Sequence, residues 1–119
     1  MQDIDIKRLV LDALDDLKGN EIICIDVTGL TQIMDHMIIA SGTSNRHVKA
    51  LARAVVEHAN AAGIKPWGSE GVEEGEWILI DLVDVVVHLM LPAVREFYDL
   101  ERLWDIRSPL RDEDSVIEN

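Results

Sequence analysis

The chain is short of cysteine, of aromatic side chains and of basic residues, and each shortage excludes a class of protein. Cys24 is the only cysteine among 119 residues, so neither an internal disulfide nor a cysteine-based zinc cluster can form. Aromatic residues make up 4% of the chain, whereas hydrophobic residues together make up 48%. We therefore expect one domain with a mostly aliphatic core, and neither a disordered segment nor a disulfide-stabilised scaffold.

Basic residues are outnumbered two to one, since 11 Lys and Arg stand against 23 Asp and Glu, for a net charge of −12. Affinity for nucleic acid comes largely from cations that displace counterions from phosphates. Direct RNA or DNA binding is therefore not expected as the main activity. A basic protein partner would be attracted to such a chain, although negative charge can also serve only to keep a small protein in solution.

Long apolar runs are also missing. None approaches the roughly 20 residues that span a bilayer, and the stretch Met1–Asp5 lacks the basic and apolar regions of a secretory signal. A cytoplasmic protein without membrane association is expected. Cys24 lies in an isoleucine-rich run, which favours a buried, inert thiol over a nucleophile.

Hydrophobic periodicity predicts an α/β order of elements in the first half and a β-hairpin in the second. The first half contains a predicted helix over 6–17, a strand over 21–27 covered on both faces, a buried strand over 37–40 and a helix over 44–63. The second half contains a short edge strand opened by Pro66–Gly68, a hairpin of strands 76–82 and 85–90, and a helix begun by Pro92, with apolar contacts from Ala93, Phe97, Leu100, Leu103 and Trp104.

Acidic residues concentrate around the predicted hairpin. Between Pro66 and Val94 there is no Lys or Arg, whereas six acids occur: Glu70, Glu73, Glu74, Glu76, Asp81 and Asp84. Trp77 and His88 lie beside these acids in the sequence, and aromatic anchors ringed by polar groups are typical of protein-recognition surfaces. A solvated acidic face without a partner would give the same pattern.

An enzymatic alternative rests on the turn Ser41, Gly42, Thr43 and Ser44 between a predicted strand and a predicted helix. Such a turn can aim backbone N–H groups at a phosphate, as in nucleotidyltransferases. Those enzymes also need paired carboxylates to hold magnesium. No Asp-x-Asp follows here, and the nearest downstream acid is Glu57. The turn is more typical of a helix cap, and a magnesium-dependent nucleotidyltransferase is kept as the alternative.

Asp81, Asp84 and His88 raise the question of a metal site. Asp84 and His88 would face the same side if both belonged to one strand. Asp84 and His88, with Asp81 as a third ligand across the turn, are too few for a specific metal signature. A hydrogen-bonded Asp–His pair that orders the hairpin is therefore favoured. No metal and no other cofactor is predicted.

Four ordered motifs carry a family resemblance: Ile38–Val48, Gly75–Asp81, Asp84–His88 and Arg95–Trp104. Together they resemble the ribosomal silencing factor family, also called Iojap-like proteins. The resemblance implies a single α/β domain over residues 1–107, whereas the polar and charged composition of residues 108–119 predicts a flexible tail. It further implies a mixed sheet of about five strands flanked by helices, like that of nucleotidyltransferases but without their catalytic acids.

The resemblance also implies a function without catalysis. Members bind the large ribosomal subunit through its protein number fourteen and block association with the small subunit, which represses translation when nutrients are scarce. A homodimer is implied for the free protein. Val83 departs from the family pattern at a turn position where glycine is expected, and Met90 replaces a frequent aromatic.

The partner-binding residues that we expect are Trp77, Asp81, Asp84 and His88, with Tyr98 and Glu70 as weaker candidates. The acids would meet cations of a basic ribosomal protein, and Trp77 would supply apolar area. Trp77 and His88 could equally belong to the core.

Overall fold

The computed structural model describes residues 5–29, 32 and 34–98. The elements along the chain are α1 (Ile6–Asp16), β1 (Asn20–Asp26), β2 (His36–Ser41), α2 (Asn45–Ala61), β3 (Gly68–Glu70), β4 (Trp77–Asp81), β5 (Val85–Met90) and α3 (Pro92–Tyr98). The predicted order of helices and strands is confirmed. The expected tail over 108–119 and the expected helical contacts of Leu100, Leu103 and Trp104 lie outside the described residues.

The five strands form one mixed sheet in the order β1-β2-β5-β4-β3. Strands β2 and β5 are parallel, whereas the other neighbouring pairs are antiparallel. The chain must cross from β2 to β5 because a parallel pair cannot be joined by a tight turn. Helix α2 lies within that crossover, and the predicted α/β fold class with a mixed sheet is confirmed.

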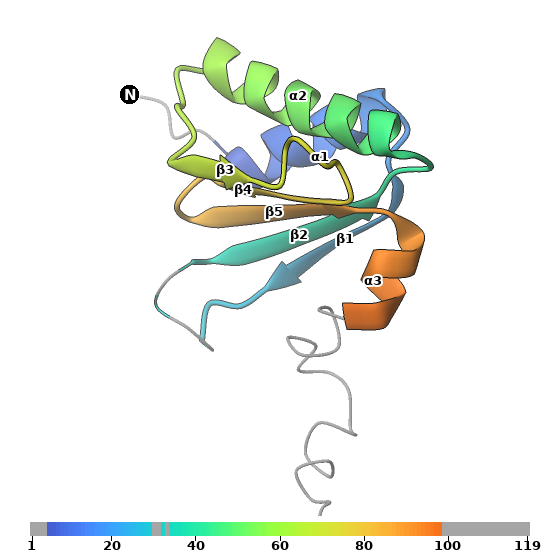
Figure 1. Cartoon of the computed structure of the whole chain (residues 1–119). Helices are drawn as coiled ribbons and strands as arrows, with labels where there is room; N and C mark the ends of the chain where they lie inside the picture. Colours follow the sequence, from blue (N-terminus) through green and yellow to red (C-terminus); the bar gives the residue numbers. More distant parts are fainter. Residues whose placement is uncertain (1–4, 30–31, 33, 99–119) are drawn as a thin grey trace, which may run out of the picture.

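Helices α1 and α2 lie side by side over one face of the sheet (Figure 1). Their apolar stripes pack against strand residues that alternate toward them, which is the period of two expected for a sheet. The resulting core includes, with no exposed surface, Val10, Leu14, Leu51, Val55, Ile38, Ile78, Ile80, Val87 and Leu89. Among the described helices, none has the length and apolarity to cross a membrane.

The opposite face of the sheet carries a second, smaller cluster built on Met37, Ile39 and Met90. Of the described helices, only α3 reaches this face, where Val94 packs against that cluster. Figure 1 shows α3 beyond the ends of the strands, on the side away from α1 and α2. The two faces are therefore covered unequally by the described elements.

Strand β1 differs from its prediction. It lies at the edge of the sheet, and its residues are half-buried or exposed instead of being covered on both faces. An isoleucine-rich run predicts strand formation, but it does not tell an edge strand from a central one. Cys24 is consequently half-buried, and partial burial raises the pKa of its thiol, which keeps the thiol in its unreactive protonated form.

Helix α3 turns a different face to the sheet from the one expected. Ala93 and Phe97 were predicted to make apolar contacts, and both are exposed, Phe97 by 79%. Val94 and Arg95 point inward instead. The prediction was wrong because a helix of two turns carries too few apolar residues for periodicity to fix its buried side.

Candidate protein-binding face

Four of the residues predicted to bind a partner share one face of the sheet. Trp77 and Asp81 each lie two residues from Leu79 in β4, so all three side chains point to the same side. The sheet register pairs Leu79 with His88 on one side and with Glu70 on the other. Trp77 packs with the second cluster, so this is the face opposite α1 and α2.

An aromatic cluster lies at one end of this face. The ring centroid of Trp77 is 4.8 Å from that of Tyr98 and 5.9 Å from that of His88. Phe97 meets Tyr98 edge to face at 4.9 Å. Tyr98 is 53% exposed and Phe97 79% exposed. The cluster therefore presents apolar area outward while its inner members are anchored in the sheet.

His88 is the inner member of the aromatic cluster. Only 7% of its surface is exposed, and burial lowers the pKa of its imidazole to about 4. Its Nδ1 accepts a hydrogen bond of 3.0 Å from Nε1–H of Trp77. An Nδ1 that accepts has no proton, so the neutral ring carries its proton on Nε2.

The two predicted aspartates lie at the other end of the hairpin. Asp81 Oδ1 accepts from the N–H of Val83 at 2.7 Å and so orders the turn. Asp84 is exposed and precedes β5, and its carbonyl accepts from the N–H groups of Asp35 and His36. Asp84 lines a pocket with Asp5, Ile6 and Lys7 at the start of α1, and the Nδ1 of His88 is bonded to Trp77 instead.

The predicted residues thus fall into two regions at opposite ends of the β4–β5 hairpin. Trp77 and Asp81 stand at opposite ends of β4, roughly 13 Å apart for four residues of extended chain. Trp77, His88 and Tyr98 form the aromatic end, and Asp81 and Asp84 form the acidic end. Within the described part of the chain, no group of three or more His, Cys, Asp or Glu side chains is placed to hold a metal ion.

The turn from Ser41 to Ser44 uses its polar groups internally. Ser41 is buried, and its Oγ accepts from the guanidinium of Arg95 at 2.9 Å. Ser44 is the N-cap of α2 and accepts from the N–H of His47 at 3.1 Å. A Cβ on Gly42 would come within 2.8 Å of Val48, so glycine allows the turn to press against the helix. The interpretation as a helix cap is confirmed for Ser44.

His47 completes that turn from within α2. Its Nδ1 accepts from the N–H of Thr43 at 2.9 Å, and its Nε2 lies 2.8 Å from the carbonyl oxygen of Leu17. The ring therefore ties the turn to the end of α1. With these bonds made, the N–H of Thr43 is not directed at an external phosphate.

Two residues of this surface escaped sequence reasoning. Phe97 was expected in the core, and Arg95 was not singled out, although its side chain is buried and ties α3 to Ser41. An Arg–Ser contact between residues 54 positions apart leaves no periodic signal in the sequence. The motif Arg95–Trp104, quoted above for its resemblance, was the only available indication.

The comparisons with known proteins identify the family. The model of the family described as "Ribosomal silencing factor during starvation" matches residues 2–119. The chain belongs to this ribosomal silencing factor family. The ribosomal silencing factor RsfS of Chromobacterium violaceum is 51% identical over 105 residues, which cover 88% of this chain and 86% of that protein.

A solved structure and a mouse protein are also similar to this chain. A crystal structure of a Chromobacterium violaceum protein superimposes with a TM-score of 0.85 at 50% identity, covering 92% of this chain and 91% of that one. The mouse protein named mitochondrial assembly of ribosomal large subunit protein 1 is 36% identical over 93 residues, 76% of this chain and 41% of that protein. The predicted family and fold are confirmed.

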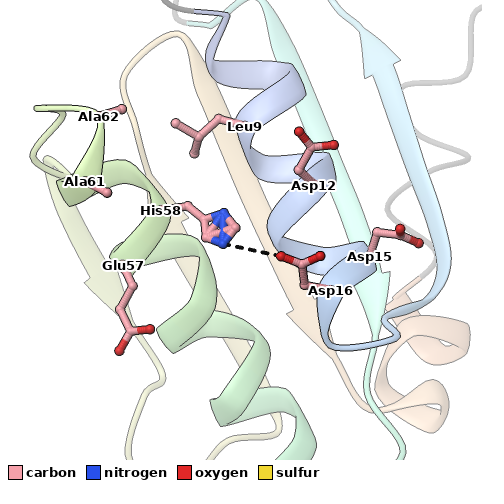
Figure 2. A pocket seen from close by; sticks show the side chains of 8 residues that line it. All are labelled: Leu9, Asp12, Asp15, Asp16, Glu57, His58, Ala61 and Ala62. Atoms are coloured by element: carbon pink, nitrogen blue, oxygen red, sulfur yellow. Dashed lines mark ion pairs between the residues drawn. The ribbon is translucent and has the colours of Figure 1, made fainter.

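This silencing-factor chain has a second acidic surface, between α1 and α2. Asp12, Asp15 and Asp16 of α1 line a groove together with Glu57 and His58 of α2. Figure 2 shows His58 turned toward Asp16, whereas Asp15 and Glu57 point away from the facing helix. His58 Nε2 lies 3.6 Å from Asp16 Oδ2. The sequence pattern indicated acidity only around the hairpin, because residues from two separate helices gather here only after folding.

Proposed function

We propose that this chain represses translation without catalysis, by binding the large ribosomal subunit through its protein number fourteen and occupying space that the small subunit needs. Membership of the silencing factor family supports the ribosome as target. The observation that carries the proposal is the aromatic cluster of Trp77, Tyr98 and Phe97 on the sheet face opposite α1 and α2. Exposed aromatic side chains anchored in a sheet are typical of the centre of a binding surface.

Charge around the aromatic cluster supports a basic partner. Glu70 and Asp81 flank the same face, and Asp84 extends the acidic end beyond β4. Ribosomal proteins carry many Lys and Arg side chains, which charge-assisted hydrogen bonds would pair with these carboxylates. His88 lies beneath Trp77, so its contribution would come through Trp77 and not through direct contact.

In the absence of ribosomes we propose a cytoplasmic homodimer. An exposed apolar patch on a small protein is unfavourable in water. Association of two copies through Phe97 and Tyr98 would bury that patch until a ribosome competes for it. The polar groups of Ser41, Thr43 and Ser44 are engaged within the fold, which gives no support to the nucleotidyltransferase alternative.

The proposed function is tested by adding the purified protein to separated ribosomal subunits. It should co-sediment with large subunits and lower the yield of joined ribosomes in a sucrose gradient. Binding to large subunits with an unchanged yield of joined ribosomes, at saturating concentration, would contradict the steric mechanism. Binding to large subunits stripped of protein fourteen would contradict the proposed contact.

A pair of tryptophan variants locates the binding surface. Trp77→Ala should weaken binding at least tenfold, as the loss of a central aromatic anchor does. Trp67→Ala is the matched control, because Trp67 is 79% exposed and directly precedes β3 on the side opposite Glu70. The control should bind like the wild type, and equal losses in both variants would remove the aromatic cluster from the interface.

A further inference from the structure

The indole of Trp77 is held between two partners from different elements. Its Nε1–H donates to Nδ1 of His88 at 3.0 Å, and its ring lies against Tyr98 of α3 with centroids 4.8 Å apart. A tryptophan that is partly open to water would otherwise sample several rotamers. Here one contact fixes the N–H edge of the ring and the other fixes its face.

The cross-strand neighbours of His88 supply no other side-chain acceptor for the indole. The sheet register places Leu79 on one side of His88 and Ile39 on the other, and both carry apolar side chains. His88 itself is 7% exposed, so a partner that docks on this face does not reach it. Its imidazole is nevertheless the only polar side chain that is hydrogen-bonded to Trp77 among the described residues.

We propose that His88 is a positioning residue for the binding of the large subunit: its Nδ1 fixes the Trp77 indole against Tyr98, so that the aromatic surface exists before the partner arrives. This inference rests on the proposed function, in which Trp77 contacts the partner. Ordering one aromatic side chain in advance removes an entropy loss at binding that corresponds to roughly threefold to tenfold in affinity.

A matched pair of variants separates the acceptor from the packing. His88→Leu places an apolar side chain of similar size at this site and removes the acceptor, which leaves the Trp77 N–H without its partner and should lower the stability of the folded protein. His88→Asn has nearly the shape of leucine and returns an acceptor oxygen close to the place of Nδ1. His88→Leu should weaken binding to large subunits threefold to tenfold, and His88→Asn should restore it to within twofold.

The Trp77 indole provides a spectroscopic readout in the same proteins without ribosomes. Its Nε1–H resonance is identified by its loss in Trp77→Phe. In His88→Leu the indole proton should shift upfield and exchange faster with water, as expected for a lost hydrogen bond, and His88→Asn should reverse both changes. Circular dichroism checks that both variants fold.

Three results would overturn the positioning role. The first is that folded His88→Leu binds large subunits with wild-type affinity although Trp77→Ala does not bind them. That result would contradict the positioning role and leave the proposed function intact. The second is an unrestored affinity in His88→Asn with its hydrogen bond regained. The third is measured on the wild type: ¹⁵N chemical shifts of the His88 imidazole that show a proton on Nδ1 would mean that Nδ1 does not accept from Trp77. Wild-type binding by Trp77→Ala would instead contradict the proposed function.

Discussion

The buried imidazole of His88 makes the stability of the protein depend on pH. Its folded-state pKa is about 4, against 6.5 for a free histidine. Between these values the unfolded chain binds a proton that the folded chain does not, so stability is complete above pH 6.5 and falls as the pH drops toward 4. The loss across this window should reach about 3 kcal/mol.

Urea unfolding at pH 7 and pH 4.5 measures this loss, with His88→Leu as the control that lacks the titrating group. The wild type should lose more stability than the variant between the two pH values. Equal losses would show that other groups govern the acid response. The pKa of Asp26 is lowered by its hydrogen bonds from Thr28, and its contribution is lost only as the pH falls below about 4, outside the window.

Val83 is the residue at which local strain is most evident. It adopts a φ of +74° in the turn between β4 and β5 and is 52% exposed. A β-branched residue is unfavourable in this region, whereas glycine is not. Val83→Gly should therefore stabilise the protein by about 1 kcal/mol, measured as a higher midpoint of thermal unfolding.

Val72→Gly is the matched control for the turn substitution. Val72 is 46% exposed and is not among the residues with positive φ. Val72→Gly should destabilise the protein or leave its stability unaltered. Glycine increases the conformational entropy of the unfolded chain, and at this position there is no positive φ whose strain it could relieve. A lower midpoint in Val83→Gly would show that packing by Val83 outweighs the strain of its backbone.

At the scale of elements, local patterns identified the helices and strands but not their surroundings. The isoleucines of β1 predicted a strand, yet its place at the edge depends on which strands pair with it. The residues of α3 predicted a helix, yet its inward face is set by Arg95 and Val94 against distant residues. Propensity and periodicity are local quantities, whereas strand order and docking are not.

The candidate site shows the same division. Trp77, Asp81, Glu70 and His88 were chosen from sequence, and the alternation of strands brings them to one face. The link from Trp77 to His88 was not predicted, because it depends on the register of the hairpin and on rotamers. Asp84 was considered as a partner of His88, and the length of the turn places it elsewhere.

The start of α2 provides a test at this scale. Ser44 caps the helix by accepting from the N–H of His47. Ser44→Ala should lower the free energy of unfolding by about 1 kcal/mol, and Ser44→Asp should restore it, because aspartate is an equally good cap. Thermal unfolding of the three proteins measures both effects. Equal destabilisation by Ala and Asp would indicate that the hydroxyl matters for another contact.

At the scale of the whole molecule, acidic side chains gather in two places, the turn end of the β4–β5 hairpin and the groove between α1 and α2. The double variant Asp81→Asn with Asp84→Lys changes the first, and asparagine keeps the acceptor that orders the turn. Asp15→Asn with Glu57→Lys changes the second by the same net charge. The first should weaken binding to large subunits several-fold, and the second should not.

Sedimentation at two salt concentrations completes this comparison. Screening weakens interactions between exposed charges, so wild-type binding should fall as salt rises, and the hairpin variant should respond less. Equal losses in both double variants would mean that net charge, and not its location, attracts the partner. Unchanged binding in a folded hairpin variant would remove Asp81 and Asp84 from the interface.

The parallel pairing of β2 with β5 has a consequence for the order in which the protein folds. We call the β2–β5 pairing the seam of the sheet. The antiparallel pair β1–β2 lies on one side of the seam, and the antiparallel strands β3, β4 and β5 lie on the other. Each of these two groups forms from contacts that are near in sequence, whereas the seam joins segments separated by α2. Pairing of distant segments is slow. Ile39 and His88 meet across the seam, so the sheet face below Trp77 is completed only when the seam closes. A refolding chain should therefore gain affinity for large ribosomal subunits in its slowest phase. A chain in which β2 and β5 have not yet paired should not bind them.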